Sequence, residues 1–321
     1  MKWQNINKVL LSPLPKGCQE WLGKLRRYSL FGARGEGNSL VAMVDGRGFQ
    51  GGLCDRWKGI VSLYAFAKAT ERDFRIYYSY PFDLHLFQLP NTYDWTISDS
   101  ALSRRFSRVK LLRVVGENDF HRLDNIPSDK QIHCYANRDW VEQINSTFGT
   151  NYRWGELFSE LFSPSTLLQN ELQKFDTYTG NPYIAVALRV QNLFGDFPEY
   201  DYHPATPEMQ AAIVKTLAKY VNSLHNKHNL PILVTSDSQT VLQTISRLCP
   251  FVFTNSGKAA HADTTADAPL AEYLKPMVDF YLLARAQKVF APATEQMYMS
   301  DFPKYAAAVN NHDFERVALH I

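Results

Sequence analysis

The stretch LVAMVDGRGFQGGLCDRW, residues 40–57, decides the fold class that the sequence predicts. Its first five residues are apolar, as in a buried strand, and a glycine-rich loop follows them. Residues 55–70 then repeat apolar side chains at helical spacing, and residues 74–78 have the composition of another strand. The apolar face of that helix consists of Ile60, Leu63, Tyr64 and Ala67. Strand, loop, helix and strand in this order form a βαβ unit and favour an α/β protein.

A second α/β series begins with YIAVALR, residues 183–189. The alternation of short β-type runs and longer helical runs continues to about residue 291. Pro276 lies inside the last expected helix and should restart or kink it. The other expected strands are residues 109–115, 131–135, 232–235, 251–253 and 289–291, and the other expected helices are residues 207–225, 241–248 and 270–286.

Bulk properties exclude several classes of protein. The chain of 321 residues fits two domains of ordinary size, and its formal net charge of +2 gives no field that would favour nucleic acid as a partner. Basic clusters at residues 24–27 and 104–108 are typical of solvated faces, with an anionic substrate or a peripheral membrane contact as the alternative. The four cysteines have no zinc-ligand spacing, and we see neither a signal peptide nor a transmembrane run, so we expect reduced thiols and a cytoplasmic setting.

Polar residues follow the expected strands of the second series, where ligands bind in open α/β sheets. Arg189 ends the first apolar run, and its guanidinium could clamp a diphosphate and stabilise a departing nucleoside diphosphate. A structural salt bridge explains the same arginine equally well, because an unpaired buried guanidinium is costly.

The turn Ser236-Asp237-Ser238 follows the next strand and can cap the helix after it. A helix N-terminus also binds an anion or a ribose, so the two interpretations are compatible. Asp279 lies in an apolar helix, where a carboxylate needs a partner. That partner could be the N–H edge of a guanine base, or else Arg285 or another basic residue.

Two loops offer weaker signals. Residues 46–52 resemble a phosphate-cradling loop but match neither standard glycine motif, so a tight turn between strand and helix explains them better. Glu199 and Asp201 follow Arg189, and either carboxylate could be a general base toward an acceptor hydroxyl. Solvated loop charges are the alternative.

The order of these segments resembles a family of fucosyltransferases with two facing Rossmann-like domains, which includes the nodulation, core α-1,6 and plant xyloglucan enzymes. GLCDR at residues 52–56 is similar to their G-L-G-D/N-R loop, and ALR at residues 187–189 to their H-x-R motif, with Ala187 in place of the histidine. TSDS at residues 235–238 resembles their T/S-D-D/S/E turn, and VDFYLL at residues 278–283 resembles V-D-[I/F]-x-x-L.

Two further segments resemble the same family. EYDYHP at residues 199–204 is similar to an E-x-x-x-H-P stretch whose glutamate is a proposed base, which points to Glu199 first and Asp201 second. Thr294 and Ser300 are the two candidates for the hydroxyl of a T/S-S-x-F stretch.

The resemblance implies an α/β fold of the GT-B type, with the active site in the cleft between its domains. Residues 1–165 would form the acceptor-side domain and residues 166–305 the Rossmann-like domain that binds the nucleotide sugar. For residues 306–321 a return to the first domain is left open. Arg189 would bind the β-phosphate of a GDP-sugar, Asp279 the guanine, and Asp237 would help to hold the nucleotide. The other donor-binding residues would be Gly51, Gly52, Asp55, Arg56, Ser236, Ser238, Thr294 and Ser300.

The function expected from the sequence is an inverting transfer of fucose, or another GDP-linked sugar, to a glycan hydroxyl, for example in surface polysaccharide synthesis. No D-x-D pair is placed as a metal site, so Arg189 would replace a cation at the leaving group and no cofactor is expected. The alternatives are a catalytically inactive nucleotide- or sugar-binding protein of the same fold, and a glycosyltransferase that uses a different nucleotide sugar.

Overall fold

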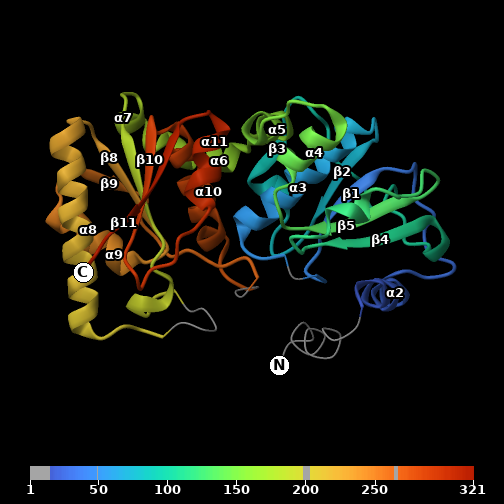
Figure 1. Ribbon diagram of the computed structural model, residues 1–321, viewed down its shortest axis with the longest axis horizontal. Helices are drawn as coiled ribbons and strands as arrows, with labels where there is room; N and C mark the ends of the chain where they lie inside the picture. The colour runs from blue at the N-terminus through green and yellow to red at the C-terminus, as the bar shows by residue number, and fades with distance from the viewer. Residues whose placement is uncertain (1–14, 49, 198–202, 264–266) are drawn as a thin grey trace. The chain divides into compact units, whose positions relative to one another are not determined.

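The computed structural model describes residues 15–48, 50–197, 203–263 and 267–321. The chain divides into two compact units, each of which has its own parallel sheet (Figure 1). Unit 1 contains the described residues up to Leu84 together with Leu89–Ser163, and unit 2 contains His85–Gln88 and Pro164–Ile321. Short strands β3 (Gln88–Pro90) and β6 (Phe162–Pro164) pair with each other at the two places where the chain passes from one unit to the other.

The sheet of unit 1 has the order β2-β1-β5-β4, and all of its strands run parallel. These strands are β1 (Leu40–Val44), β2 (Phe74–Tyr78), β4 (Val109–Val114) and β5 (Gln131–Ala136). Each one coincides with a strand expected from the sequence to within a residue, because apolar runs bounded by turns are the pattern of buried parallel strands.

Helix α3 (Leu53–Ala69) covers one face of this sheet, and its residues from Arg56 to Ala67 are all buried. Gly59 allows the close approach, since a β-carbon there would lie 2.2 Å from the carbonyl oxygen of Ala136. Helices α4 (Val141–Phe148) and α5 (Trp154–Leu161) pack on α3, and α2 (Lys16–Arg27) packs on β4. Single turns of 3-10 helix complete the unit at η1 (Leu84–Leu86, at its boundary), η2 (Phe106–Arg108) and η3 (Phe120–Leu123).

The sheet of unit 2 has the order β11-β10-β7-β8-β9, again with all strands parallel. Numbered along the chain within this unit, that order is 5-4-1-2-3, which is the Rossmann arrangement read from its other edge. The winding direction therefore reverses between β7 and β10. The strands are β7 (Ile184–Leu188), β8 (Ile232–Ser236), β9 (Val252–Thr254), β10 (Lys288–Ala293) and β11 (Asp313–Ala318).

Helices cover both faces of this sheet, as Figure 1 shows. Ile184, Val186 and Leu188 of β7 face the core under α8 (Pro207–His228) and α9 (Gln239–Leu248). The alternate side chains of β7 and β8 therefore face the layer of α10 (Leu270–Arg285) and α11 (Phe302–Val309). The remaining helical segments are α6 (Thr166–Gln173), which packs on α10, α7 (Asp176–Thr179) and η4 (Gln191–Phe194).

Helix α10 continues through Pro276, so the expected restart does not occur. A proline lacks the N–H that would bind the carbonyl of the residue four positions earlier, here Glu272. The backbone N–H of Ala260 donates to that carbonyl at 2.8 Å instead. The loop before the helix thus satisfies the acceptor that Pro276 leaves without a helical partner.

The C-terminal segment lies in unit 2. Strand β11 pairs with β10 over its whole length, from Lys288 opposite Asp313 to Ala293 opposite Ala318, and α11 packs on both strands. The sequence hides this strand, because it is a half-exposed edge rich in charged residues.

Candidate functional site

The carboxyl ends of the parallel strands of unit 2 meet at one edge of the sheet. Arg189 follows β7, Asp237 follows β8, Asn255 follows β9 and Thr294 follows β10. The fold thus gathers onto one edge the polar groups that the sequence places after separate strands. This is the edge at which doubly wound α/β proteins bind their ligands.

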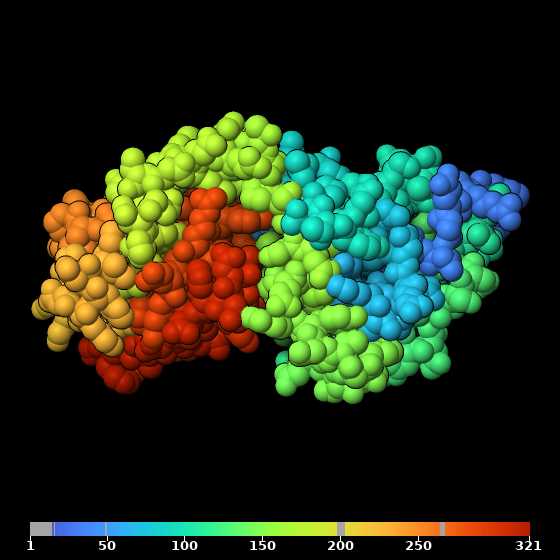
Figure 2. Space-filling view, turned by 90° about the horizontal axis from the view of Figure 1, so that it is seen from above, coloured from blue at the N-terminus to red at the C-terminus, as the bar shows by residue number. Residues whose placement is uncertain are grey.

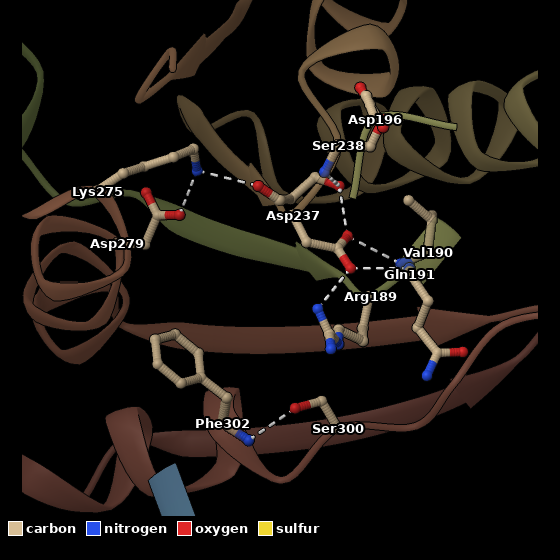
Figure 3. A network of polar contacts seen from close by, with 11 residues as sticks. Arg189, Val190, Gln191, Asp196, Asp237, Ser238, Lys275, Asp279, Ser300 and Phe302 are labelled. Carbon is tan, nitrogen blue, oxygen red and sulfur yellow. Dashed lines mark hydrogen bonds and ion pairs between the residues drawn. The ribbon is translucent and has the colours of Figure 1, made fainter. Parts of the chain in front are cut away.

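Asp237 connects the ends of β7 and β8 (Figure 3). Its Oδ2 accepts hydrogen bonds from Arg189 Nη1 and from the backbone N–H of Gln191, both at 2.7 Å. Its Oδ1 accepts from the backbone N–H of Val190 at 3.0 Å and from Ser236 Oγ at 3.2 Å. A carboxylate offers about four lone-pair sites. Asp237 therefore uses its acceptor capacity to hold Arg189 and the backbone that follows it.

Arg189 is both anchored and accessible. Its side chain is 22% exposed, whereas that of Asp237 is 6% exposed. The guanidinium lies 4.6 Å from the centre of the Phe197 ring, which supports it by a cation–π contact. The salt bridge that was the structural alternative exists, and the arginine side chain remains partly exposed.

The N-terminus of α9 already has an anionic partner. Ser238 caps the helix by accepting from the backbone N–H of Val241 at 3.1 Å, as expected from the sequence. Asp196 Oδ2 accepts from Ser238 Oγ and from the backbone N–H of Thr240, both at 2.9 Å. Asp196 was not among the site residues expected from the sequence. Its position after Gly195, in the loop that leaves β7, was the available signal.

Asp279 and Lys275 form a buried ion pair on α10 (Figure 3). Lys275 Nζ donates to Asp279 Oδ2 at 2.6 Å and to the carbonyl of Ser236 at 2.9 Å. Asn255 Nδ2 donates to Asp279 Oδ1 at 2.8 Å. Burial raises the pKa of Asp279, and the contacts with Lys275 and Asn255 oppose that rise. The basic partner that the sequence left open is thus Lys275 rather than Arg285.

Buried polar atoms without a hydrogen-bond partner among the described residues flank the reversal of winding direction between β7 and β10. They include Gln191 Oε1 and Asp196 Oδ1 after β7, and Thr294 Oγ1 and Gln296 Oε1 after β10. Each such atom costs about 1–3 kcal/mol when it remains unsatisfied. Gln191 has a left-handed backbone conformation (φ 52°). Asp237 stabilises it by accepting a hydrogen bond from the Gln191 N–H. Ser300 lies nearby in sequence and accepts from the backbone N–H of Phe302 at 3.1 Å, at the start of α11.

Gly51, in the glycine loop of unit 1, has no room for a side chain. Gly51 has φ 79°, and a β-carbon there would lie 2.3 Å from Asp55 Oδ2. Gly52 caps α3, and Asp55 forms an ion pair with Lys58 at 2.7 Å.

Arg56 is almost completely buried inside unit 1. Its guanidinium donates to the carbonyls of Gly51 and Tyr80 at 3.3 and 2.8 Å and to the Tyr78 hydroxyl at 3.1 Å. These contacts account for Arg56 as a residue that shapes the loop, and they do not test its expected role in donor binding. Glu199 and Asp201, the two candidate bases, lie outside the described residues.

Each of the two α/β units has a parallel sheet, and one of them has Rossmann strand order with an arginine at its carboxyl edge. This is a GT-B type of fold. The comparison with solved structures agrees. The chain is similar to NodZ α-1,6-fucosyltransferase soaked with GDP-fucose, at 15% identity and a TM-score of 0.52, with 85% of this chain and 92% of that chain covered. For the same enzyme co-crystallised with GDP the identity is 14% and the TM-score 0.53, with 85% of this chain and 92% of that chain covered. For fucosyltransferase NodZ from Bradyrhizobium the identity is 15% and the TM-score 0.51, with 84% of this chain and 92% of that chain covered.

At this identity the likeness shows the fold, and it confirms the fold class expected from the sequence. No family model and no curated protein sequence matches the chain.

Proposed function

We propose that this protein is an inverting, metal-independent glycosyltransferase that transfers a sugar from a GDP-sugar to a glycan hydroxyl. Fucose is the first candidate for that sugar. The observation that carries the proposal is the partly exposed side chain of Arg189, whose guanidinium Asp237 fixes at the carboxyl edge of a Rossmann-type sheet. The likeness to solved structures of a fucosyltransferase studied with GDP and GDP-fucose supports it.

In the proposed reaction the acceptor oxygen forms a bond to the anomeric carbon, and the bond from that carbon to the β-phosphate oxygen breaks. The electron pair of the broken bond stays on the departing GDP. Arg189 stabilises this new negative charge, and because Asp237 holds it in advance, little reorganisation is needed. The acceptor proton goes to a carboxylate, with Glu199 as the first candidate and Asp201 as the second. Attack on the face opposite the leaving group inverts the configuration.

Asp279 would recognise guanine through the acceptor sites that its two partners leave. Lys275 and Asn255 each use one site on a different oxygen. A carboxylate has about four such sites, so two remain for the adjacent N–H donors of a guanine edge. In this proposal Lys275 keeps Asp279 ionised and correctly oriented, and Asn255 fixes the plane of the carboxylate.

Ala187 is the observation that keeps a different donor in consideration. It stands where the resembling enzymes have a histidine, and it lies opposite Thr235 of β8 on the face that α10 covers. A methyl group there offers no hydrogen bond to a nucleotide. Thermal unfolding with GDP, UDP and ADP tests the nucleotide. GDP at a hundredfold excess over its Kd should stabilise the protein by about 2.7 kcal/mol, with smaller shifts for UDP and ADP.

Equal shifts with the three nucleotides would contradict guanine recognition by Asp279. An absence of any shift would contradict a nucleotide donor. The inactive-protein alternative is tested separately, because an active transferase slowly hydrolyses its donor to free GDP without any acceptor, whereas an inactive binding protein does not.

A further inference from the structure

Four large apolar side chains lie exposed within one short segment of unit 1. Trp21 and Leu25 of α2 are 57% and 48% exposed, and Leu30 and Phe31, which follow the helix, are 72% and 89% exposed. Thirteen large hydrophobic side chains are exposed in the described residues, so this segment holds almost a third of them. Clustered exposure of this kind marks an interaction surface.

The outward direction of these side chains follows from how α2 is attached. Its inner face carries Glu20, which accepts from the backbone N–H of Arg113 at 2.7 Å and from Arg122 at 2.8 Å. Gly23 lies on the same face, where a β-carbon would be 3.3 Å from Leu111. Trp21 and Leu25 are one helical turn apart and so share the face away from β4. In Figure 2 the blue atoms that follow α2 lie at the surface of unit 1.

Basic residues surround this apolar segment. Residues 16–34 contain five lysines and arginines and a single acidic residue, the buried Glu20, and residues 104–113 contain five basic residues and no acidic one. The backbone joins the two segments, since Ser29 N–H donates to the Arg104 carbonyl at 3.0 Å and Phe106 N–H donates to the Ser29 carbonyl at 2.9 Å. The net charge of the whole chain is only +2, so its positive charge is concentrated here.

The cations of this surface repel one another. Burial lowers the pKa of Lys24, and the neighbouring charges of Lys130 and Lys110 lower it further. The Lys24 ammonium lies 4.1 Å from the centre of the Phe106 ring. An anionic partner would relieve this repulsion.

We propose that Trp21, Leu25, Leu30 and Phe31, with the basic residues of segments 16–34 and 104–113, dock the protein on a membrane surface that contains anionic lipid. The apolar side chains would enter the headgroup region while the lysines and arginines contact lipid phosphates. A second copy fits poorly, because a two-fold contact places the same basic patch on both sides. A transmembrane anchor is a different matter, and no helix in the described residues is both long and apolar enough to cross a bilayer.

Co-sedimentation of the full chain with vesicles tests the proposal. Vesicles of phosphatidylcholine with one quarter phosphatidylglycerol should sediment the protein at least tenfold more effectively than phosphatidylcholine alone. Raising the salt from 0.1 to 1 M shortens the screening length from about 10 to about 3 Å and should release most of it. Equal binding to both kinds of vesicle, or none to either, would overturn the proposal.

Matched variants distinguish specific binding through this surface from non-specific adsorption to vesicles. Leu30→Ser with Phe31→Ser should abolish most of the binding, whereas Leu248→Ser with Tyr298→Ser, at sites in unit 2 that are 52% and 53% exposed, should not. Arg26→Gln with Arg34→Gln and Lys110→Gln should weaken it, in contrast to Lys215→Gln with Lys219→Gln and Lys227→Gln on α8. Equal losses in the matched sets would contradict a specific surface.

Fluorescence gives an independent readout. Of the six tryptophans, Trp3 lies outside the described residues, Trp57, Trp95, Trp140 and Trp154 are buried, and Trp21 is exposed. In a Trp3→Phe background, anionic vesicles should shift the emission to shorter wavelength, and Trp21→Leu should remove that shift while it keeps the binding. Two results would assign the surface to another partner and overturn the proposal: retention on heparin without vesicle binding, or a dimer that Leu30→Ser with Phe31→Ser dissolves, again without vesicle binding.

Discussion

Asp237 holds Arg189 at the carboxyl edge of the unit 2 sheet with a 2.7 Å charge-assisted hydrogen bond, and it binds the backbone of the next two residues with the same carboxylate. The arginine and the start of its loop are therefore fixed by one side chain from the neighbouring strand. This relationship makes Asp237 a positioning residue for Arg189 in the proposed function.

Asp237→Asn should weaken both the fold and the site. The asparagine retains one acceptor oxygen, so either the two bonds on Oδ2, from Arg189 and the Gln191 N–H, or the two on Oδ1, from the Val190 N–H and Ser236, are lost. We expect the free energy of unfolding to fall by about 1–3 kcal/mol and GDP affinity to fall about tenfold, or about 1.4 kcal/mol. Urea unfolding and calorimetric titration measure the two effects. Glu171→Gln, at a surface pair with Lys174, is the control and should change neither. Unchanged GDP affinity in Asp237→Asn would separate Asp237 from the site.

Lys275→Met should be strongly destabilising, because it leaves Asp279 as a buried carboxylate without its cation. We expect a loss of about 3–5 kcal/mol in the free energy of unfolding, measured with urea. Lys174→Met removes an exposed cation from a comparable pair and should cost less than about 1 kcal/mol. Lys275→Met combined with Asp279→Leu should recover most of the loss. Equal effects of the two single lysine variants would show that burial of the pair is unimportant.

Thr294→Val removes a buried hydroxyl that has no partner among the described residues. Such a change should leave the free energy of unfolding equal or slightly higher, since the shape is conserved. If the hydroxyl binds the donor, GDP affinity should fall about three- to tenfold, or about 0.7–1.4 kcal/mol. Thr244→Val on the surface of α9 is the control. A loss of stability with unchanged GDP affinity would make Thr294 a structural residue only.

His133 should make unit 1 sensitive to acid. Its Nδ1 faces the Tyr28 hydroxyl and its Nε2 faces Gln131 Oε1, both at 2.7 Å. Gln131 Oε1 also accepts from the Ser103 backbone, so Nε2 carries the proton and the ring is neutral. Burial, with the charges of Arg104 and Arg27, lowers the pKa of His133 from 6.5 to about 3.

Between those two pH values the unfolded chain binds a proton that the folded chain does not, so stability falls as the pH falls below about 6.5. The slope from this group is at most about 1.4 kcal/mol per pH unit. Urea unfolding from pH 7 to pH 5 should therefore show a flatter dependence for His133→Gln than for the wild type or for His320→Gln, which is highly exposed. Identical slopes in the three proteins would rule out this protonation.

Most of the fold could be predicted from apolar runs in the sequence. The strands of both main sheets, apart from β11, could be predicted because parallel strands are buried on both faces and read as continuous apolar segments. Helix α2 and strand β11 could not, since half of each is exposed and charged. Of the two alternatives expected at Pro276, a restart or a kink, the restart was wrong: the helix continues, and the Ala260 N–H satisfies the carbonyl of Glu272.

The sequence predicts where the site residues lie on the sheet better than it predicts which side chains they contact. Arg189, Asp237 and Thr294 follow strands, and parallel strand ends meet, so their common edge could be expected. Their partners could not be read from spacing. Lys275 as the cation of Asp279, Asp196 as the anion of α9, and the burial of Arg56 all depend on how helices pack on the sheets.

Release of GDP from GDP-fucose, measured for the wild type and for Arg189→Ala with and without a glycan acceptor, tests the central claim most directly. We predict that the wild type forms GDP and that Arg189→Ala is slower by a factor of about 10²–10³, with its unfolding transition checked in parallel. A wild type that binds GDP but releases none from GDP-fucose, or an Arg189→Ala variant with normal turnover, would contradict it.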